Sequence, residues 1–161
     1  MTIVLWNIRS AWNVGSIMRS CDAIGADLIL VGYTPIPEGS TLKAVIKTAI
    51  GAEKNVKWRS FPHYQDVLQY LPNFQHWGIE INQSSQDILS FLDEQKAKNT
   101  PVSWDNTCLW FGNEITGLTE EVSQHLSGQL HLPMKGKKES LNVSNTVTSA
   151  AYLWMWGSKV G

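Results

Sequence analysis

The sequence has few cysteines and no long hydrophobic run, and both absences narrow the class of protein. Only Cys21 and Cys108 occur among 161 residues, without a CxxC pair or metal-ligand spacing. We therefore expect a reducing compartment, no disulfide framework and no metal. No apolar run approaches the roughly 20 residues that span a bilayer, and the first ten residues lack a signal-peptide pattern. These features predict a cytoplasmic protein without a membrane segment.

Two common nucleotide-binding fingerprints are also missing. Neither a GxGxxG motif nor a P-loop occurs, which weighs against nicotinamide and ATP chemistry. The formal net charge is only -1, yet the charges are unevenly distributed. Residues 1–63 carry seven Lys/Arg against four Asp/Glu, residues 64–134 two against nine, and residues 135–161 four against one. If the two basic segments meet in space they form a phosphate-binding patch suited to RNA; otherwise they are ordinary solvated surface.

Hydrophobic residues make up 43% of the chain and include eight Trp, enough for the core of one compact domain spanning 1–161. Apolar patterns of strand type alternate with patterns of helix type along this domain. The predicted strands are 2–5, 28–32, 56–58, 77–81, 107–111 and 130–132. The predicted helices are 13–24, 42–50, 64–71, 86–92, a short helix capped by Thr119, and 140–156. This alternation predicts an α/β fold with a mostly parallel sheet, helices on both faces and ligands beyond the carboxyl ends of the strands.

The segment from Gly112 to Thr119 follows the predicted strand 107–111 directly. A glycine in this position allows a ligand to approach the backbone closely. Glu114 would then lie beside the ligand, although a solvated loop carboxylate is an equally good interpretation. Neither interpretation can be preferred from this segment alone.

The C-terminal segment combines a strand that ends at Pro133, a lysine-rich loop and a helix that is apolar on most faces. Ser140, Asn142 and two later polar residues could each cap this helix. An ordinary capped core helix would explain the pattern. Its core stripe would then consist of Val143, Val147, Ala150, Ala151 and Trp154. However, Leu153, Met155 and Trp156 widen this stripe almost all round, and Trp154, Met155 and Trp156 would otherwise leave a large apolar patch exposed, which favours coverage by a second subunit and hence a homodimer.

Three separated motifs, each after a predicted strand, resemble the SpoU/TrmH family of the SPOUT methyltransferase superfamily, in its minimal single-domain form. They are Asn13-Val14-Gly15-Ser16-Ile17-Met18-Arg19, then Gly112-Asn113-Glu114 with Gly117-Leu118, and finally Leu132-Pro133-Met134 with Ser140-Leu141-Asn142. The resemblance implies a C-terminal trefoil knot, an exception to the rule that chains are unknotted. It also implies S-adenosylmethionine (AdoMet) as methyl donor and a homodimer joined through the first and last helices.

Residue roles follow from the same resemblance, position by position. The residues expected to bind AdoMet are Ile79, Glu80, Gly112, Leu132, Met134, Ser140 and Leu141. The residues expected in the catalytic set are Asn13, Arg19, Glu114, Ser140 and Asn142.

The reaction implied by the resemblance is methyl transfer to a ribose 2′-hydroxyl of structured RNA. Arg19 could act as the base, but deprotonating an arginine at neutral pH costs roughly 7 kcal/mol. We therefore prefer an electrostatic clamp on the adjacent phosphate and the developing oxyanion. Transfer RNA is favoured over ribosomal RNA because of the small size of the chain. The alternatives are an inactive RNA-binding dimer of the same fold and an enzyme that methylates a base.

No additional RNA-binding domain is evident in the sequence, so we expect RNA to contact the catalytic domain itself. Basic side chains in the two positive segments are the expected phosphate contacts, which position RNA without reading its sequence. They are Arg9, Lys43, Lys47, Lys135, Lys137 and Lys138.

Overall fold

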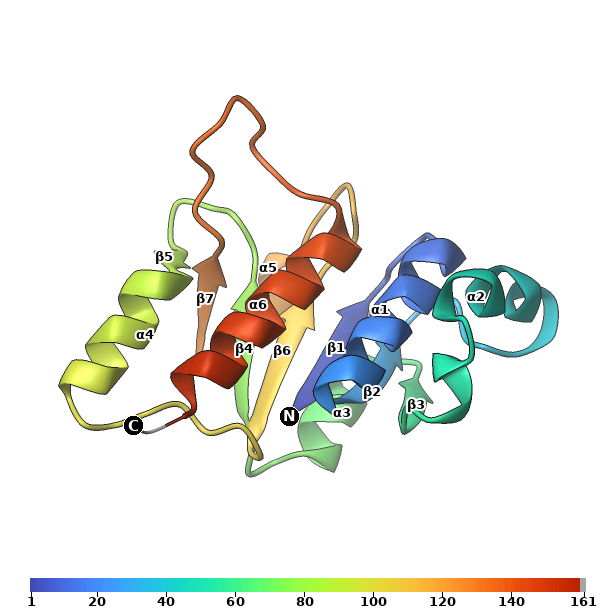
Figure 1. Cartoon of the computed structure of the whole chain (residues 1–161), viewed down its shortest axis with the longest axis horizontal. Coiled ribbons are helices and arrows are strands. Elements are labelled where there is room, and N and C mark those ends of the chain that lie inside the picture. Colours follow the sequence, from blue (N-terminus) through green and yellow to red (C-terminus); the bar gives the residue numbers. More distant parts are fainter. Residues whose placement is uncertain (160–161) are drawn as a thin grey trace.

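The computed structural model describes residues 1–159 and has a seven-stranded parallel sheet at its centre. The strands lie in the order β3-β2-β1-β6-β4-β7-β5 (Figure 1). Their bounds are β1 Thr2–Trp6, β2 Asp27–Val31, β3 Trp58–Phe61, β4 Gln75–Ile79, β5 Gln86–Asp87, β6 Thr107–Phe111 and β7 Gly128–His131. The predicted α/β class with a parallel sheet is confirmed. The trefoil knot stays a prediction, because strand pairing does not record how the chain is threaded.

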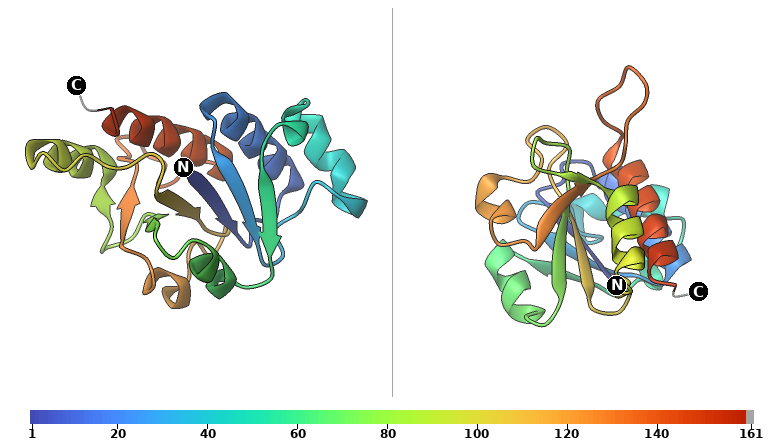
Figure 2. Two further views of the ribbon diagram at one scale, coloured as in Figure 1. Left: turned by 90° about the horizontal axis from the view of Figure 1, so that it is seen from below. Right: turned by 90° about the vertical axis from the view of Figure 1, so that its left-hand side faces the viewer.

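Helices cover both faces of the sheet. Their bounds are α1 Ala11–Ile24, α2 Leu42–Ala49, α3 Tyr64–Tyr70, α4 Ile88–Ala97, α5 Glu120–Ser123 and α6 Val143–Gly157, with short 3-10 turns η1 Gly39–Thr41 and η2 Ala52–Lys54. Figure 2 shows α1, α2, α4 and α6 along one face and α3 and α5 along the other. Each face has its own hydrophobic cluster, and all five residues of β6 are buried between the two. This double coverage explains why the strands read as continuous apolar runs.

The first helix begins three residues earlier than the sequence predicts. Ser10, rather than Asn13, is the N-cap, and its hydroxyl accepts a hydrogen bond from the Asn13 backbone N–H at 3.3 Å. The side chain of Asn13 is thereby left free for other contacts. The predicted end is confirmed, since Gly25 terminates α1 in the left-handed conformation with φ 68°.

Glycine at position 15 allows two helices to approach closely. A Cβ atom built on Gly15 would lie 2.1 Å from the Thr48 hydroxyl and 2.2 Å from the Val45 carbonyl oxygen of α2. Any side chain here would push α2 away from α1. The glycine of the first motif is therefore explained by helix packing.

The last helix buries the apolar stripe that its helical spacing predicts and leaves other apolar residues exposed. Val147, Ala150, Ala151 and Trp154 form its fully buried stripe, and the Trp154 indole N–H donates to the Ser103 carbonyl at 3.1 Å. Trp154 is thus a core residue of its own chain and cannot contribute to an exposed dimer patch, contrary to our expectation. Trp156 is the exposed member, with 76% of its surface accessible.

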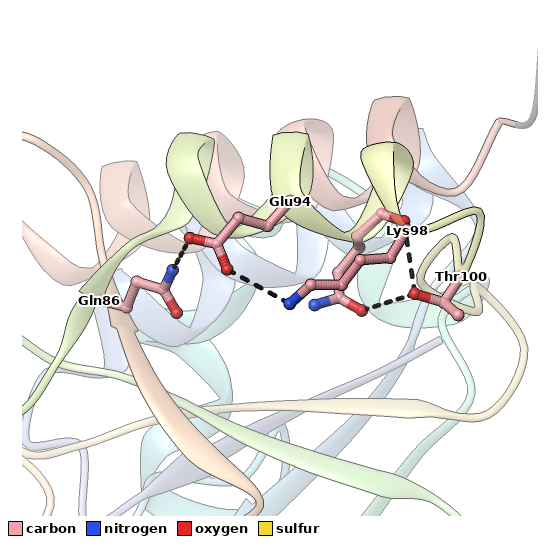
Figure 3. Close-up of polar contacts among 5 residues, drawn as sticks. Gln86, Glu94, Lys98 and Thr100 are labelled. Carbon is pink, nitrogen blue, oxygen red and sulfur yellow. Dashed lines mark hydrogen bonds and ion pairs between the residues drawn. The ribbon is translucent and has the colours of Figure 1, made fainter.

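The boundaries of other elements differ modestly from prediction. β3 lies two to three residues later than expected, and α4 begins at Ile88 because Asp87 accepts the capping hydrogen bonds from Leu89 and Ser90. On the outer surface of α4, Glu94 accepts from the Gln86 amide at 3.0 Å and lies 3.8 Å from the Lys98 ammonium (Figure 3). Such an exposed ion pair contributes little stability. Among residues 1–159 no helix is long and apolar enough to cross a membrane.

Candidate active site at the carboxyl ends of the strands

A pocket opens where β4, β6 and β7 end, as the parallel sheet predicts. Ile79, Phe111 and Leu130 lie in register at the ends of these three strands, and the chain turns away from the sheet just beyond them. The long segment 132–142 extends past this edge before α6 begins (Figure 1). The pocket is lined by Ile79, Glu80, Ile81, Phe111, Gly112, Asn113, Glu114, His131, Leu132, Met134, Ser140, Leu141, Asn142, Val143 and Thr146.

The loop after β6 closes tightly on itself. A Cβ atom on Gly112 would lie 2.2 to 2.4 Å from backbone atoms of Gly117 and Leu118. Gly112 is therefore required by the loop's own backbone, and since it also lines the pocket, its predicted role beside a ligand stays a prediction. Glu80 holds the other side of this loop, since its carboxylate accepts from the Leu118 N–H at 2.9 Å and from the Ile81 N–H at 3.1 Å.

Asn113 anchors the same loop to the rest of the sheet. Its side-chain oxygen accepts from the N–H groups of Ile115 and Thr116, at 2.8 and 3.0 Å. Its amide donates to the Asn7 carbonyl at 2.8 Å and to the Tyr33 hydroxyl at 2.7 Å. With only 6% of its surface exposed, Asn113 uses both amide hydrogens and its oxygen in protein contacts.

Glu114 lies at the rim and joins the loop to the start of α1. Its carboxylate accepts from the backbone N–H of Arg9 at 2.9 Å, from that of Ser10 at 3.2 Å and from the Asn13 amide at 3.0 Å. Burial alone would raise the pKa of this carboxyl group, but these hydrogen bonds outweigh burial, so the pKa lies below its ordinary value of 4.5. Glu114 is therefore ionised at neutral pH and firmly held.

A second link connects α1 with α6. The Asn142 amide donates to the Asn13 side-chain oxygen at 3.3 Å, while the Asn142 oxygen accepts from the N–H and hydroxyl of Ser144 as the N-cap of α6. Glu114, Asn13 and Asn142 thus form a chain of hydrogen bonds across three segments that are far apart in sequence. We call these three residues the polar rim.

The pocket gathers most of the residues singled out from the sequence. All seven residues expected to bind AdoMet line it, as do three of the expected catalytic residues, Glu114, Ser140 and Asn142. Asn13 joins them through the polar rim. Their proximity is an observation, whereas their roles in binding and catalysis stay predictions.

Arg19 is the member of the predicted catalytic set that one chain does not bring to the pocket. It is exposed on α1, as its place off the apolar stripe predicts, and among residues 1–159 it has no ion-pair partner. Six residues separate it from Asn13, which corresponds to about 9 Å along a helix and about 120° around it. Arg19 therefore faces away from the polar rim.

The predicted RNA contacts fall into two groups. Lys135, Lys137 and Lys138 are exposed on the long segment beside the pocket, and Arg9 is exposed next to Glu114. Lys43 and Lys47 lie on α2, where the Lys47 ammonium stands 4.7 Å from the centre of the Trp12 ring. The α2 lysines do not line the pocket.

Asn113 and His131 are pocket residues that sequence reasoning missed. His131 ends β7, and its Nδ1 lies 2.9 Å from the Ser85 hydroxyl. A histidine at a strand end carries no sequence signal that reveals this contact. For Asn113 a signal existed, because Asn directly after a buried strand often forms the side-chain turn seen here.

The chain belongs to the SpoU rRNA Methylase family, whose sequence model it matches over residues 1–152. It is 28% identical over 144 residues to the tRNA (guanosine(18)-2′-O)-methyltransferase of Thermus thermophilus, covering 89% of this chain and 68% of that protein. It is 26% identical over 145 residues to the 23S rRNA (guanosine-2′-O-)-methyltransferase RlmB of Neisseria meningitidis, covering 89% of this chain and 53% of that protein. The chain therefore spans about half to two thirds of the length of these curated relatives.

Solved structures share the fold. AviRb of Streptomyces viridochromogenes, a SpoU methyltransferase in complex with AdoMet, superposes with a TM-score of 0.80 at 22% identity, covering 97% of this chain and 57% of AviRb. The TrmH/SpoU tRNA modifying enzyme of A. aeolicus superposes with a TM-score of 0.77 at 23% sequence identity, covering 97% of this chain and 74% of that enzyme. A structure that was solved to study the 2-OH methylation of C/U34 on tRNA superposes with a TM-score of 0.78 at 23% sequence identity. The match covers 97% of this chain and 94% of that one. These likenesses confirm the predicted α/β architecture with a parallel sheet flanked by helices.

Proposed function

We propose that residues 1–161 form one AdoMet-dependent methyltransferase domain that methylates a ribose 2′-hydroxyl of tRNA in the cytoplasm. The observation that carries this proposal is the pocket at the ends of β4, β6 and β7, which is lined by residues of the second and third motifs and joined to Asn13 of the first motif by its hydrogen bonds with Glu114 and Asn142. Membership of the family supports RNA methylation. The choice of tRNA rests on similarity to tRNA-modifying relatives, and rRNA is the alternative because a 23S rRNA enzyme is also similar.

The pocket suits AdoMet by the chemistry of its lining. Aliphatic side chains of Ile79, Leu132 and Leu141 offer an apolar surface for a flat purine, and Ser140 adds a polar group. Glu80, Gly112 and Met134 complete the set that would hold the molecule. When bound, AdoMet supplies an electrophilic methyl group on a sulfonium sulfur.

The polar rim would position the RNA ribose at the mouth of this pocket. Glu114 is already bound by three donors and ionised, so it is a weak base, and we assign it to holding Asn13 and the start of α1. Asn13, Ser140 and Asn142 can then orient a nucleotide through uncharged hydrogen-bonding groups. Such positioning lowers the barrier by up to about 7–11 kcal/mol in favourable cases.

Arg19 would act as the electrostatic clamp, although it faces away from the polar rim of its own chain. It is exposed on α1, which packs beside α6 through the 2.7 Å contact between Ser20 and Thr148 hydroxyls. We propose a homodimer formed through these two helices. A second chain, or the RNA itself, would bring Arg19 to the reacting ribose.

The decisive test compares modified nucleosides from cells with and without the protein by mass spectrometry. We expect one 2′-O-methylated nucleoside to disappear from the tRNA pool and to return when purified protein and AdoMet are added. If the 2′-O-methylated nucleoside disappears from rRNA instead, rRNA is the substrate. Loss of a base methylation would favour the base-methylating enzyme. No change in any modified nucleoside, together with intact RNA binding, would favour the inactive RNA-binding dimer.

Two further measurements address the cofactor and the assembly. We expect AdoMet to bind with micromolar-range affinity in calorimetry, and no heat at millimolar AdoMet would contradict this. We expect a dimer in sedimentation at micromolar protein, and a monomer there would contradict the proposed interface.

A further inference from the structure

An exposed tyrosine is fixed to the loop that carries Glu114. Tyr33 follows β2 and has 63% of its surface exposed. Its hydroxyl oxygen accepts from the buried Asn113 amide at 2.7 Å, and its backbone N–H donates to the Asn7 side chain at 3.2 Å. The ring is thus held at the same strand ends that form the active-site edge.

The anchoring of Tyr33 is tied to the geometry of the polar rim. Asn113 donates its second amide hydrogen to the Asn7 carbonyl, and Asn7 leads directly into the turn whose Arg9 and Ser10 N–H groups bind Glu114. Asn7 itself has a φ of 56°, in the left-handed region, which fits a position defined by these contacts. A ligand that contacts Tyr33 would therefore lie beside the polar rim.

Most of the Tyr33 surface is accessible to a ligand. Among residues 1–159, no aromatic or cationic side chain stacks on this ring. Two other exposed aromatics differ: Lys47 lies over Trp12, and Arg59 lies 5.2 Å from the centre of the Tyr70 ring. Trp156 is more exposed, but it lies at the end of α6 away from the pocket (Figure 1).

We propose that Tyr33 is a stacking platform for a nucleobase of the RNA next to the methylated nucleotide. A free aromatic face held rigidly beside a ribose-binding rim suits an unstacked base, because every base has a flat face that can stack on an aromatic ring. The Tyr33 hydroxyl accepts from Asn113, and its own hydrogen stays available to donate to an RNA oxygen. Arg9, exposed two residues beyond Asn7, would contact a neighbouring phosphate. This inference rests on the proposed RNA methyltransferase function and adds a base-binding site to it.

The test uses the full chain with Tyr33→Ala, Tyr33→Phe and the matched control Tyr70→Ala. Tyr70 is also an exposed tyrosine, but it lines a groove at the opposite ends of β1, β2 and β3. Affinities for total tRNA and total ribosomal RNA from cells lacking the protein are measured in separate titrations, together with AdoMet affinity and thermal unfolding. Stacking predicts that Tyr33→Ala weakens binding of the responsive RNA by about 5- to 150-fold. Tyr33→Phe should stay within about threefold of wild type, and Tyr70→Ala should match wild type.

Salt dependence distinguishes stacking from a lost phosphate contact. Since no counterion release is involved, Tyr33→Ala should weaken binding without changing the slope of affinity against salt, whereas Lys137→Ala should flatten that slope. Wild-type RNA affinity in Tyr33→Ala would overturn the proposal. Equal losses in Tyr33→Ala and Tyr33→Phe would also overturn it, because the hydroxyl brace and not the ring would then matter. If the wild-type protein neither binds nor methylates either RNA pool, the proposed function itself fails, and the Tyr33 site fails with it.

Discussion

Replacing Glu114 with glutamine tests the polar rim most directly. The change keeps the size of the side chain but removes its charge and converts one acceptor oxygen into a donor. Of the three hydrogen bonds, two end on one carboxylate oxygen, from the Ser10 N–H and the Asn13 amide, and one ends on the other, from the Arg9 N–H. An amide cannot accept at both positions, so at least one donor loses its partner.

The size of the effect follows from these contacts. A hydrogen bond to a charged group contributes about 1.5–3 kcal/mol when it is well shielded, but Glu114 lies at the solvent-exposed rim and water can replace part of what is lost. We expect Glu114→Gln to lower the free energy of unfolding by about 1–2 kcal/mol, which for a chain of this size lowers Tm by roughly 2–8 °C. Methyl transfer should fall more than AdoMet binding, because one carboxylate would no longer hold Asn13 and the Arg9–Ser10 turn together.

The pH dependence provides an internal check on the cause. The pKa of Glu114 is lowered in the folded state, so its stabilising contribution is complete above the ordinary value of 4.5 and is lost as pH falls through the folded pKa. The stability difference between wild type and Glu114→Gln should therefore shrink at acid pH. Glu38→Gln is the matched control, since the Glu38 carboxylate makes no hydrogen bond among residues 1–159. A Glu114→Gln protein with wild-type Tm and activity at pH 7 would refute this account of the rim.

Three other predictions follow from groups outside the rim. Burial lowers the pKa of His76, which accepts from the Trp110 indole, so the stability that neutral His76 provides should be lost as pH falls from its ordinary value of 6.5 through the folded pKa. Urea unfolding at pH 7 and pH 5 should show this loss, and it should be smaller in His76→Gln. Burial raises the pKa of both Cys21 and Cys108 to about 12, so iodoacetamide at pH 8 should label neither until denaturant is added; rapid labelling of the native protein would contradict the structure. In single-turnover methylation from pH 7 to 10, Arg19→Ala should be almost inactive and Arg19→Lys only slightly more active. Both variants should fold and bind AdoMet as the wild type does. A Lys variant with substantial activity that rises with pH would show that residue 19 acts as a base.

The sequence predicted the layer architecture and the place of the pocket because both depend on local patterns. Continuous apolar runs separated by helical stripes define buried parallel strands, and the carboxyl ends of such strands share one edge. The residues after β4, β6 and β7 therefore had to lie close together, and the pocket is lined by them. Helix ends were less predictable, because Ser10 and Asn13 are both good caps and only the contacts of Asn13 with Glu114 and Asn142 separate them.

The buried side of α6 could be predicted from helical spacing, because four of the five residues of the predicted stripe are buried. A helix with Trp154, Met155 and Trp156 in succession must direct these side chains to different sides, since successive residues lie about 100° apart. Helical spacing places Trp154 on the same stripe as Val147 and Ala151, and this stripe faces the core. Trp154 packs there against Trp77 and Phe91, with ring centres 6.1 and 6.0 Å apart, whereas Trp156 is exposed. A dimer interface on α6 must therefore be argued from Trp156 and its neighbours.

The first motif shows how several physical requirements can share one short helix. Asn13 joins the polar rim, Gly15 allows the close approach of α2, Ile17 is fully buried, and Arg19 is exposed. Because successive members are two residues and about 200° apart, no single surface can contain all four. Packing explains the glycine and the isoleucine, so only Asn13 and Arg19 need a chemical explanation, and they point to different surfaces. A site that uses both must be completed by something outside one chain, which is why the oligomeric state and the activity of the Arg19 variants have to be measured together.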